Sequence, residues 1–152
     1  MSIDDRLKAL NIVLPEAPRP LASYAPIART GNVLFVSGQG PMIDGRPVVK
    51  GKLGGTVSED DGIKAARLAA VNALAVLASA LGSLERVTRI VKLNGYVNCT
   101  DDFERQHVIV NGASELLVEV FGEKGRHARA AVGTNALPMG IPVELELMVE
   151  VV

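Results

Sequence analysis

The stretch Val143–Val151 alternates without exception between apolar residues at odd positions and Glu or Met at even positions. A period of two is that of a β-strand, whose successive side chains point to opposite faces of a sheet. One face of this strand must therefore cover an apolar core. The other face presents Glu144, Glu146, Met148 and Glu150 to solvent or to another copy of the chain. Any fold of this chain must contain a sheet with such a polar face.

Two long helices are expected to cover the apolar face of that sheet. Ser58 with Asp61 three residues later, apolar residues at steps of three and four, and Gly82 predict a helix over about 59–81. A second helix is predicted from about Asp102, capped by Thr100 or Asp101, to Gly122. Asn111-Gly112 is a candidate interruption of this second helix.

The remaining segments predict strands and one short helix. Ser2 and Asp5 form a capping box for a helix within residues 2–14, which ends before Pro15. Thr30-Gly-Asn32 is expected to turn a β-hairpin, and residues 87–97 are expected to be a strand. The turn at 137–140 is short, so the strand that begins near Arg129 is expected to pair with Val143–Val151. That pairing would bring Arg129 near Glu144, on the sheet face that does not cover the core.

These elements predict an α+β fold, in which a mixed sheet carries two long helices on one face. The 152 residues suffice for one substantial core, so a single domain over residues 1–152 is expected, with residues 2–14 as a helical extension. No uncharged apolar run approaches the roughly 20 residues of a membrane span. The acidic start of the chain does not resemble a signal peptide, so a cytoplasmic protein is expected.

Composition also limits the partners of this chain. The net charge is −1, and the chain has three Phe, two Tyr and no Trp. Such a chain offers neither a basic stripe nor a stacking platform, which disfavours binding to nucleic acid. The single cysteine, Cys99, excludes an intramolecular disulfide and is interpreted as a small buried apolar residue. A site for a small, near-neutral ligand fits the composition better.

Taken alone, each candidate site residue has an ordinary structural explanation. An arginine on a strand, such as Arg129, usually forms a structural ion pair or faces solvent. Glu144 alone would be one more residue of a polar face, and Tyr24 would be a core or rim aromatic. His127, next to the arginine segment, would be an exposed loop residue. Only their combination and spacing point to a site.

That combination resembles the reactive-intermediate deaminase family (RidA/YjgF), also called endoribonuclease L-PSP. The resemblance rests on Ser37-Gly-Gln39, the alanine-rich helix, Ala128-Arg129, and Leu137-Pro followed by Val143-Glu-Leu-Glu146, within about residues 20–151. It implies a chorismate-mutase-like fold that assembles as a homotrimeric barrel, with sites in the clefts between subunits. It further implies that Arg129 binds the substrate carboxylate and Glu144 positions water. The substrate-binding positions would be Tyr24, Ser37, Gly38 and Ala131.

The resemblance predicts an enzyme that hydrolyses enamine or imine intermediates of small amino acids to keto acid and ammonia, as 2-iminobutanoate/2-iminopropanoate deaminases do. The expected reaction uses no metal and no cofactor. The alternative is a binding or regulatory protein for keto acids on the same scaffold. Ala131 stands where the family often has cysteine and His127 where it has proline, and the second helix is longer around 108–114. These departures leave both functions open.

Overall fold

The computed structural model describes residues 1–20 and 22–152, which form a five-stranded sheet of order β1-β2-β7-β5-β6. The strands pair antiparallel except β5 and β6, which run parallel. Their bounds are β1 Ile27–Thr30, β2 Val33–Gln39, β5 Val87–Asn98, β6 Ala128–Thr134 and β7 Val143–Val151. The small hairpin of β3 (Met42–Ile43) and β4 (Arg46–Pro47) lies outside this sheet. The mixed α+β architecture agrees with the expectation.

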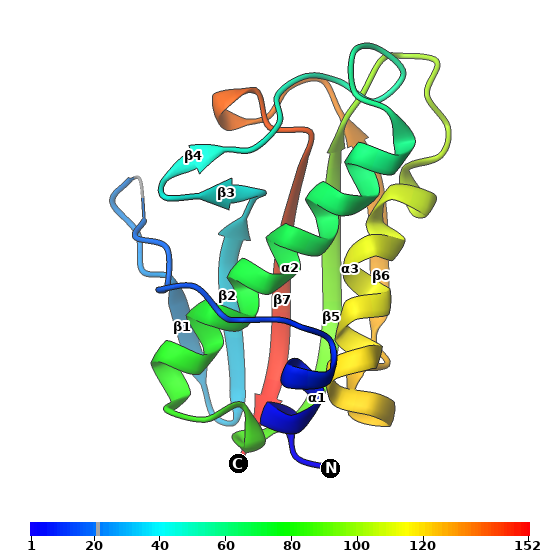
Figure 1. Ribbon diagram of the computed structural model, residues 1–152. Helices are drawn as coiled ribbons and strands as arrows, with labels where there is room; N and C mark the ends of the chain where they lie inside the picture. The colour runs from blue at the N-terminus through cyan, green and yellow to red at the C-terminus, as the bar shows by residue number, and fades with distance from the viewer. Residues whose placement is uncertain (21) are drawn as a thin grey trace.

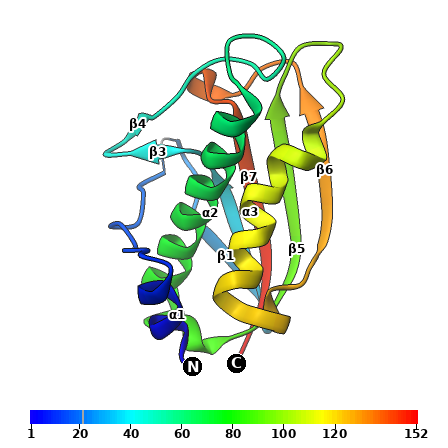
Figure 2. The ribbon, with the colours of Figure 1, turned by 45° about the vertical axis from the view of Figure 1, so that its right-hand side comes forward.

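Two helices, α2 (Glu59–Leu81) and α3 (Gln106–Phe121), lie side by side over one face of the sheet (Figures 1 and 2). The odd residues of β7 are buried beneath them, while the even residues face the other side. The two helices approach each other closely at Gly112, because a Cβ there would lie 2.1 Å from the Ile63 carbonyl oxygen. Gly112 is thus a packing residue, and it does not interrupt α3.

The expected pairing of the strand at Arg129 with Val143–Val151 is wrong. β6 pairs only with β5, and β7 lies between β2 and β5. Neighbouring strands are about 4.8 Å apart, so residues 135–142 need to span only about 10 Å to pass β5. A short connection containing Pro138 and Gly140 therefore does not require a hairpin.

The start of α3 also differs from the prediction. The helix begins at Gln106 after Arg105, which makes no side-chain cap, and not near Asp102. The Thr100 hydroxyl donates to Asp102 Oδ1 at 2.7 Å, and Gln106 Nε2 donates to the Phe103 carbonyl at 2.7 Å. Local side-chain hydrogen bonds of this kind compete with helix formation and hold this segment in turns.

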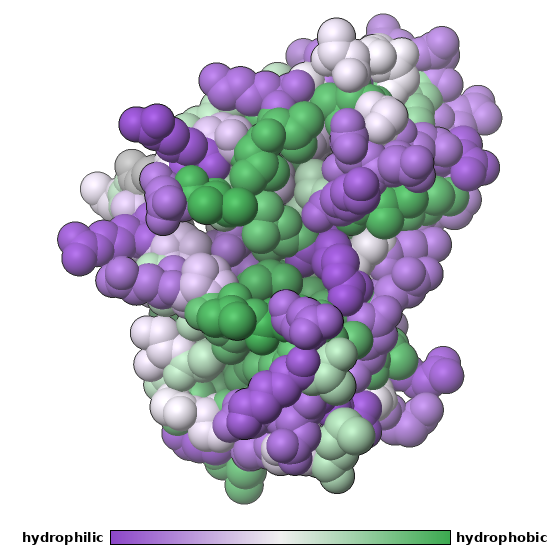
Figure 3. Space-filling model, in the orientation of Figure 1, coloured by the Kyte–Doolittle hydropathy of each residue, from purple (hydrophilic) through white to green (hydrophobic). Residues whose placement is uncertain are grey.

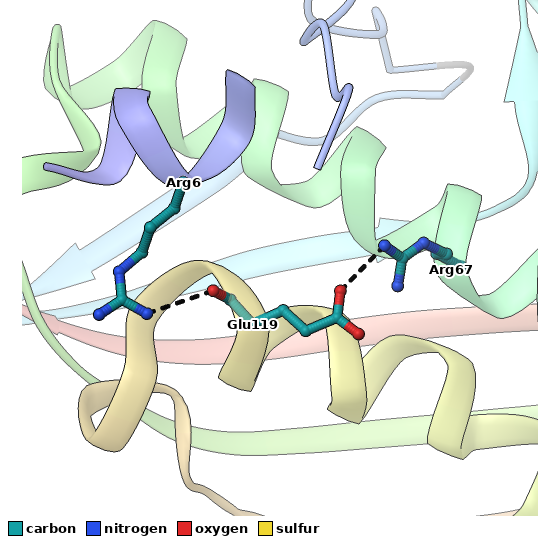
Figure 4. Close-up of polar contacts among 3 residues, drawn as sticks. All are labelled: Arg6, Arg67 and Glu119. Atoms are coloured by element: carbon teal, nitrogen blue, oxygen red, sulfur yellow. Dashed lines mark hydrogen bonds and ion pairs between the residues drawn. The ribbon is translucent and has the colours of Figure 1, made fainter. Parts of the chain in front are cut away.

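The predicted capping box of the first helix is confirmed. α1 (Ile3–Ala9) is capped by reciprocal hydrogen bonds between Ser2 and Asp5, and it buries Ile3 and Leu7. On its outer side, Arg6 Nη1 donates to the Glu119 carbonyl of α3 at 3.3 Å (Figure 4). The Glu119 carboxylate in turn pairs with Arg67 of α2 at 3.0 Å. Glu119 thereby joins all three helices.

Beyond α1, the chain continues as an extended arm that crosses α2 toward the β1 side of the molecule (Figure 1). This N-terminal arm, residues 10–20, packs apolar side chains against the core. The members in contact with the core are Leu10, Ile12, Leu14 and Ala17.

α2 carries Lys64 and Arg67, but it is long and apolar enough to span a membrane by length and composition alone. In the structure this helix covers the sheet, and 56% of its most apolar window is buried. The same residues contribute to the apolar core, among them Ala66, Ala69, Ala70, Ala73 and Leu74. The apolarity of α2 is therefore used in packing against the sheet.

Candidate functional site

Glu144 lines a cavity of about 880 Å³ at one end of the sheet. The cavity is bounded by the N-terminal arm, the β2–β3 connection, the β3–β4 hairpin, α2 and the segment before β7. Tyr24 and Gly38 line it as well. Three of the predicted site residues, distant in sequence, are thus brought together in one cavity.

The Glu144 carboxyl lies against the backbone of Gly38. A Cβ at residue 38 would lie 2.7 Å from Glu144 Oε1, so only glycine leaves room for this approach. Burial, and secondarily the charge of Glu146, raises the pKa of Glu144 above its ordinary value of 4.5. Within the described residues, no hydrogen-bond donor reaches this carboxylate. Glu144 is therefore a partly desolvated group with free acceptor capacity.

Ser37 is not part of the cavity lining, whereas Tyr24 is. The Ser37 hydroxyl donates to the Ala25 carbonyl at 2.6 Å, and the Ser37 amide donates to Pro26 at 3.0 Å. Ser37 therefore fixes the segment that carries Tyr24, which is 49% exposed at the cavity rim. The Ser37 hydroxyl thus donates its proton to the protein, while its oxygen can still accept a hydrogen bond.

Arg129 lies on the opposite edge of the sheet, where α3 holds its guanidinium. Arg129 Nη1 donates to Asn111 Oδ1 at 2.8 Å and to Ser114 Oγ at 3.3 Å, and Nη2 donates to the His107 carbonyl at 3.2 Å. A guanidinium carries five N–H donors, so these bonds leave the Nε–H and one Nη2–H. The side chain is fixed by one helix and retains donors for a further acceptor.

His127 extends this hydrogen-bonded group. Its Nδ1 lies 2.6 Å from the Gly125 carbonyl, which can only accept, so Nδ1 carries the proton. Nε2, 2.9 Å from Ser114 Oγ, then accepts from the serine hydroxyl. Burial, and to a lesser extent Arg129, lowers the pKa of His127, while its bond to Gly125 opposes this change. The neutral ring thus orients Ser114, whose oxygen accepts from Arg129.

The predicted proximity of Arg129 and Glu144 within one chain is therefore wrong. Arg129 is in register with Leu93 of β5, and Leu93 with Leu147 of β7, all on the helix-covered face. Glu144 is three residues from Leu147 and points to the other face, with β5 between its strand and β6. Ala131, half-buried, shares the edge strand and face of Arg129. The candidate site is therefore divided in two. The glutamate half consists of Glu144 with Gly38 and Tyr24, and the arginine half consists of Arg129 with Ala131 and the α3 residues that hold the guanidinium.

The partners of Arg129 were missed by sequence reasoning, although a signal for them exists. His107, Asn111 and Ser114 follow one another at steps of four and three, which places them on one side of a helix. This polar stripe lies on a different side of α3 from its buried apolar residues, such as Ile109, Leu116 and Val120. The sequence alone could not show that the stripe faces Arg129, because that depends on the pairing of β6 with β5.

No group of three potential metal ligands from His, Cys, Asp or Glu occurs in the part of the chain that the structure describes. The arrangement instead offers a guanidinium for an anion, a desolvated carboxylate as a base, and an apolar cavity. These are the components of acid–base chemistry on a small carboxylate-bearing molecule.

A family model described as "YjgF/chorismate mutase-like, putative endoribonuclease" matches residues 4–151. The chain belongs to the YjgF/RidA family. The matched range begins at Asp4, the second residue of α1.

Relatives in this family cover nearly the whole chain. Protein TCP17 of Trypanosoma cruzi is 43% identical over 145 residues, which are 95% of this chain and 91% of the relative. The crystal structure of Atu1372 from Agrobacterium tumefaciens is 46% identical, with a TM-score of 0.92 over 99% of this chain and 92% of that protein. RidA from an Antarctic Psychrobacter is 25% identical, with a TM-score of 0.63 over 90% and 94% of the two chains.

Proposed function

We propose that this protein hydrolyses 2-imino acids, and their enamine tautomers, to 2-keto acids and ammonia at sites formed between copies of the chain. The observation that carries the proposal is the division of the site. A partly desolvated carboxylate lines a cavity on one side of the sheet, while a guanidinium with free donors lies at the far edge. Each half lacks what the other half supplies.

Assembly of copies resolves this division. A neighbouring copy that places its β6 edge beside the cavity brings its own Arg129 to the first copy's Glu144. Cyclic assembly of three such contacts gives a closed trimer, the assembly proposed here from the family resemblance. The polar face with Glu146, Met148 and Glu150 then lies within the assembly. In a monomer the two halves would remain on opposite faces.

The reaction needs few groups from the protein. Water adds to the C=N carbon of the imine, which gives a carbinolamine, and the C–N bond then breaks to release ammonia and leave the keto acid. Glu144 takes a proton from the attacking water and returns it to the nitrogen, which gives the neutral carbinolamine. As the C–N bond breaks, Glu144 takes the hydroxyl proton of the carbinolamine and passes it to the departing nitrogen, so that both protons of the water leave with the ammonia. Burial raises the pKa of Glu144, which makes its carboxylate a stronger base than that of an exposed glutamate.

The remaining residues hold the substrate. The free Nε–H and Nη2–H donors of Arg129 suit a carboxylate, since a guanidinium and a carboxylate can form two parallel hydrogen bonds. Ala131 accompanies Arg129 on β6 and shapes that wall of the cleft. Tyr24 covers the ligand from the rim of the cavity, and Gly38 admits the Glu144 carboxyl. Positioning of this kind can contribute about 7 to 11 kcal/mol to lowering a barrier.

Subunit mixing tests the proposal. Arg129→Ala chains, impaired in binding, and Glu144→Gln chains, impaired in turnover, are co-expressed with different affinity tags, purified through both tags and assayed at a substrate concentration at which neither variant alone is active. Imino acids are generated by an amino-acid oxidase and trapped with semicarbazide, and loss of the semicarbazone signal measures deamination. One native site forms in each mixed trimer, so about a third of the parent activity per trimer should return.

Two outcomes would contradict this assignment. If the mixed trimers remain inactive while the parent deaminates imino acids, Arg129 and Glu144 do not meet between copies. If the parent consumes no imino acid but binds keto acids, the protein is instead a carboxylate-binding member of the family. Tagged Arg129→Ala trimers without the second variant serve as the control for assembly.

A further inference from the structure

We propose that the cavity beside Glu144 binds a large apolar side chain of the substrate, so that imino acids with an aromatic or long aliphatic side chain are preferred over those derived from alanine or 2-aminobutanoate. This inference rests on the proposed function and adds a substrate class to it.

The volume of the cavity favours a substrate with a large side chain. The cavity of about 880 Å³ lies near the upper end of the roughly 300 to 1,000 Å³ typical of pockets for drug-sized ligands. An imino acid with a methyl side chain has only six heavy atoms and would leave most of this space to water. A substrate whose side chain fills the cavity gains binding from the apolar surface that it buries.

The lining supports the same conclusion. Most residues around the cavity are apolar, and they come from separate parts of the chain: the N-terminal arm, the β3–β4 hairpin, α2 and the segment before β7. They include Val13, Pro15, Pro18, Met42, Ile43, Leu68, Val71 and Met139. Figure 3 shows hydrophobic surface gathered where Figure 1 places α2 and the hairpin. Because Glu144 lines this same cavity, the side chain of a substrate held at Glu144 can reach these walls.

One buried polar residue holds a wall of the cavity in place. Asn72 of α2, 1% exposed, donates through Nδ2 to the carbonyls of Gly40 at 2.9 Å and Met42 at 3.0 Å. These bonds fix the connection between Gly38 and the β3–β4 hairpin, which is one wall. Among the described residues no donor reaches Asn72 Oδ1. A mainly apolar cavity with one such acceptor resembles a ligand site more than a packing defect.

The N-terminal arm gives this cavity its second wall. Its inner residues Leu10, Ile12 and Leu14 pack against the core, so the arm is held in place and does not only rest on the surface. Val13 and the residues from Pro15 to Pro20 line the cavity. Prolines at positions 15, 18 and 20 restrict the backbone here, which makes a preformed wall and lowers the entropic cost of binding.

Binding of stable product analogues tests the inference without requiring turnover. Isothermal titration of the parent with phenylpyruvate and with pyruvate should show about tenfold to hundredfold tighter binding of phenylpyruvate. Val71→Phe, which adds a ring to the α2 wall, should remove most of this preference and change pyruvate binding less than about twofold. Ile43→Phe, at a 56% exposed position on the hairpin wall, should act in the same direction without altering the core.

Val48→Phe is the matched control, because Val48 is 50% exposed and lies outside the cavity lining. It should leave both affinities unchanged. Thermal unfolding of each variant identifies any that fails to fold. If Val71→Phe does not fold, the effect of Ile43→Phe on the preference for phenylpyruvate decides the test. Equal binding of pyruvate and phenylpyruvate by the parent, or a preference that survives both filling variants, would overturn the inference.

The two proposals fail in different ways. If the parent deaminates the imine of alanine as efficiently as that of phenylalanine, the substrate class is wrong while the deaminase function stands. If phenylpyruvate binds tightly and Val71→Phe weakens it, but no imine is consumed, the cavity assignment stands and the deaminase function is wrong.

Discussion

The glutamate half and the arginine half of the candidate site are built by opposite means. Glu144 stands on a central strand beside a glycine, where burial removes water and no described donor replaces it. Arg129 stands on the edge strand and is held by Asn111, Ser114 and the His107 carbonyl. The first half is left reactive by the absence of partners, and the second is oriented by their presence.

This difference fits the two tasks. A base that must take and return a proton benefits from a raised pKa and free acceptor sites. A clamp that must meet a carboxylate benefits from fixed direction, because less rotamer freedom is lost when the ligand binds. We therefore expect changes on the glutamate side to affect turnover, and changes on the arginine side to affect binding.

The largest effect is expected for Glu144→Gln, which keeps the size of the side chain and removes the base. Turnover of imino acids should fall by about 10² to 10⁴, the usual contribution of a general base. Binding of a keto acid should persist or tighten, because one negative charge near the ligand is lost. Steady-state deamination and calorimetric titration measure the two quantities. Equal losses in turnover and binding would contradict the expectation that the glutamate half affects turnover and the arginine half affects binding.

Arg129→Lys should mainly weaken binding. Lysine keeps the charge but not the two parallel donors, so the affinity for a keto acid should fall at least about tenfold, and Arg129→Ala should weaken it further. The melting temperature should change little, since Arg129 borders the core without entering it. Parent-like binding by both variants, or failure of both to fold, would make Arg129 a structural residue.

A smaller effect is expected from the residues that hold Arg129. Asn111→Ala removes the 2.8 Å hydrogen bond and should lower keto acid affinity by about threefold to tenfold, with turnover at saturation nearly unchanged. Ser114→Ala removes a longer bond, at 3.3 Å, and should have a weaker effect in the same direction. In an Arg129→Ala background, Asn111→Ala should have no further effect on affinity. An undiminished effect there would show that Asn111 acts independently of Arg129.

The smallest effect concerns stability. The pKa of Glu144 is raised in the folded protein, so ionisation of this group costs stability as pH rises from the ordinary value of 4.5 through the raised value. Glu144→Gln has no such cost and should therefore unfold on the order of 2 °C higher than the parent at pH 7. This gain should disappear below pH 4.5. Thermal unfolding of both proteins is measured between pH 4 and pH 7. A difference in melting temperature that did not change with pH would refute the desolvation of Glu144.

The sequence predicted much of the fold because the relevant signals are local. The cap residues Ser2 and Ser58, the terminating Gly82 and the alternation in Val143–Val151 each depend only on neighbours along the chain. The hairpin at Gly31 follows from local turn chemistry in the same way.

The site was less predictable because it depends on strand order. The residue spacing identified Arg129 and Glu144 as candidates, but β5 separates their strands, and no local feature of residues 134–143 reveals this. The roles of Asn111 and Asn72 depend on which way each helix faces the sheet. Such information arises only when distant segments pack together.

The contact at Gly112 has a consequence for the arginine half. An α-helix turns about 100° per residue, so Asn111 and Gly112 point in different directions, one toward Arg129 and the other toward α2. Only at residue 112 can α3 approach the Ile63 carbonyl so closely, and this fixes the rotation of α3 about its own axis. If the helix turned by a single residue, Asn111 would no longer face the guanidinium. A glycine with no chemistry of its own thus determines the direction in which the arginine donors point.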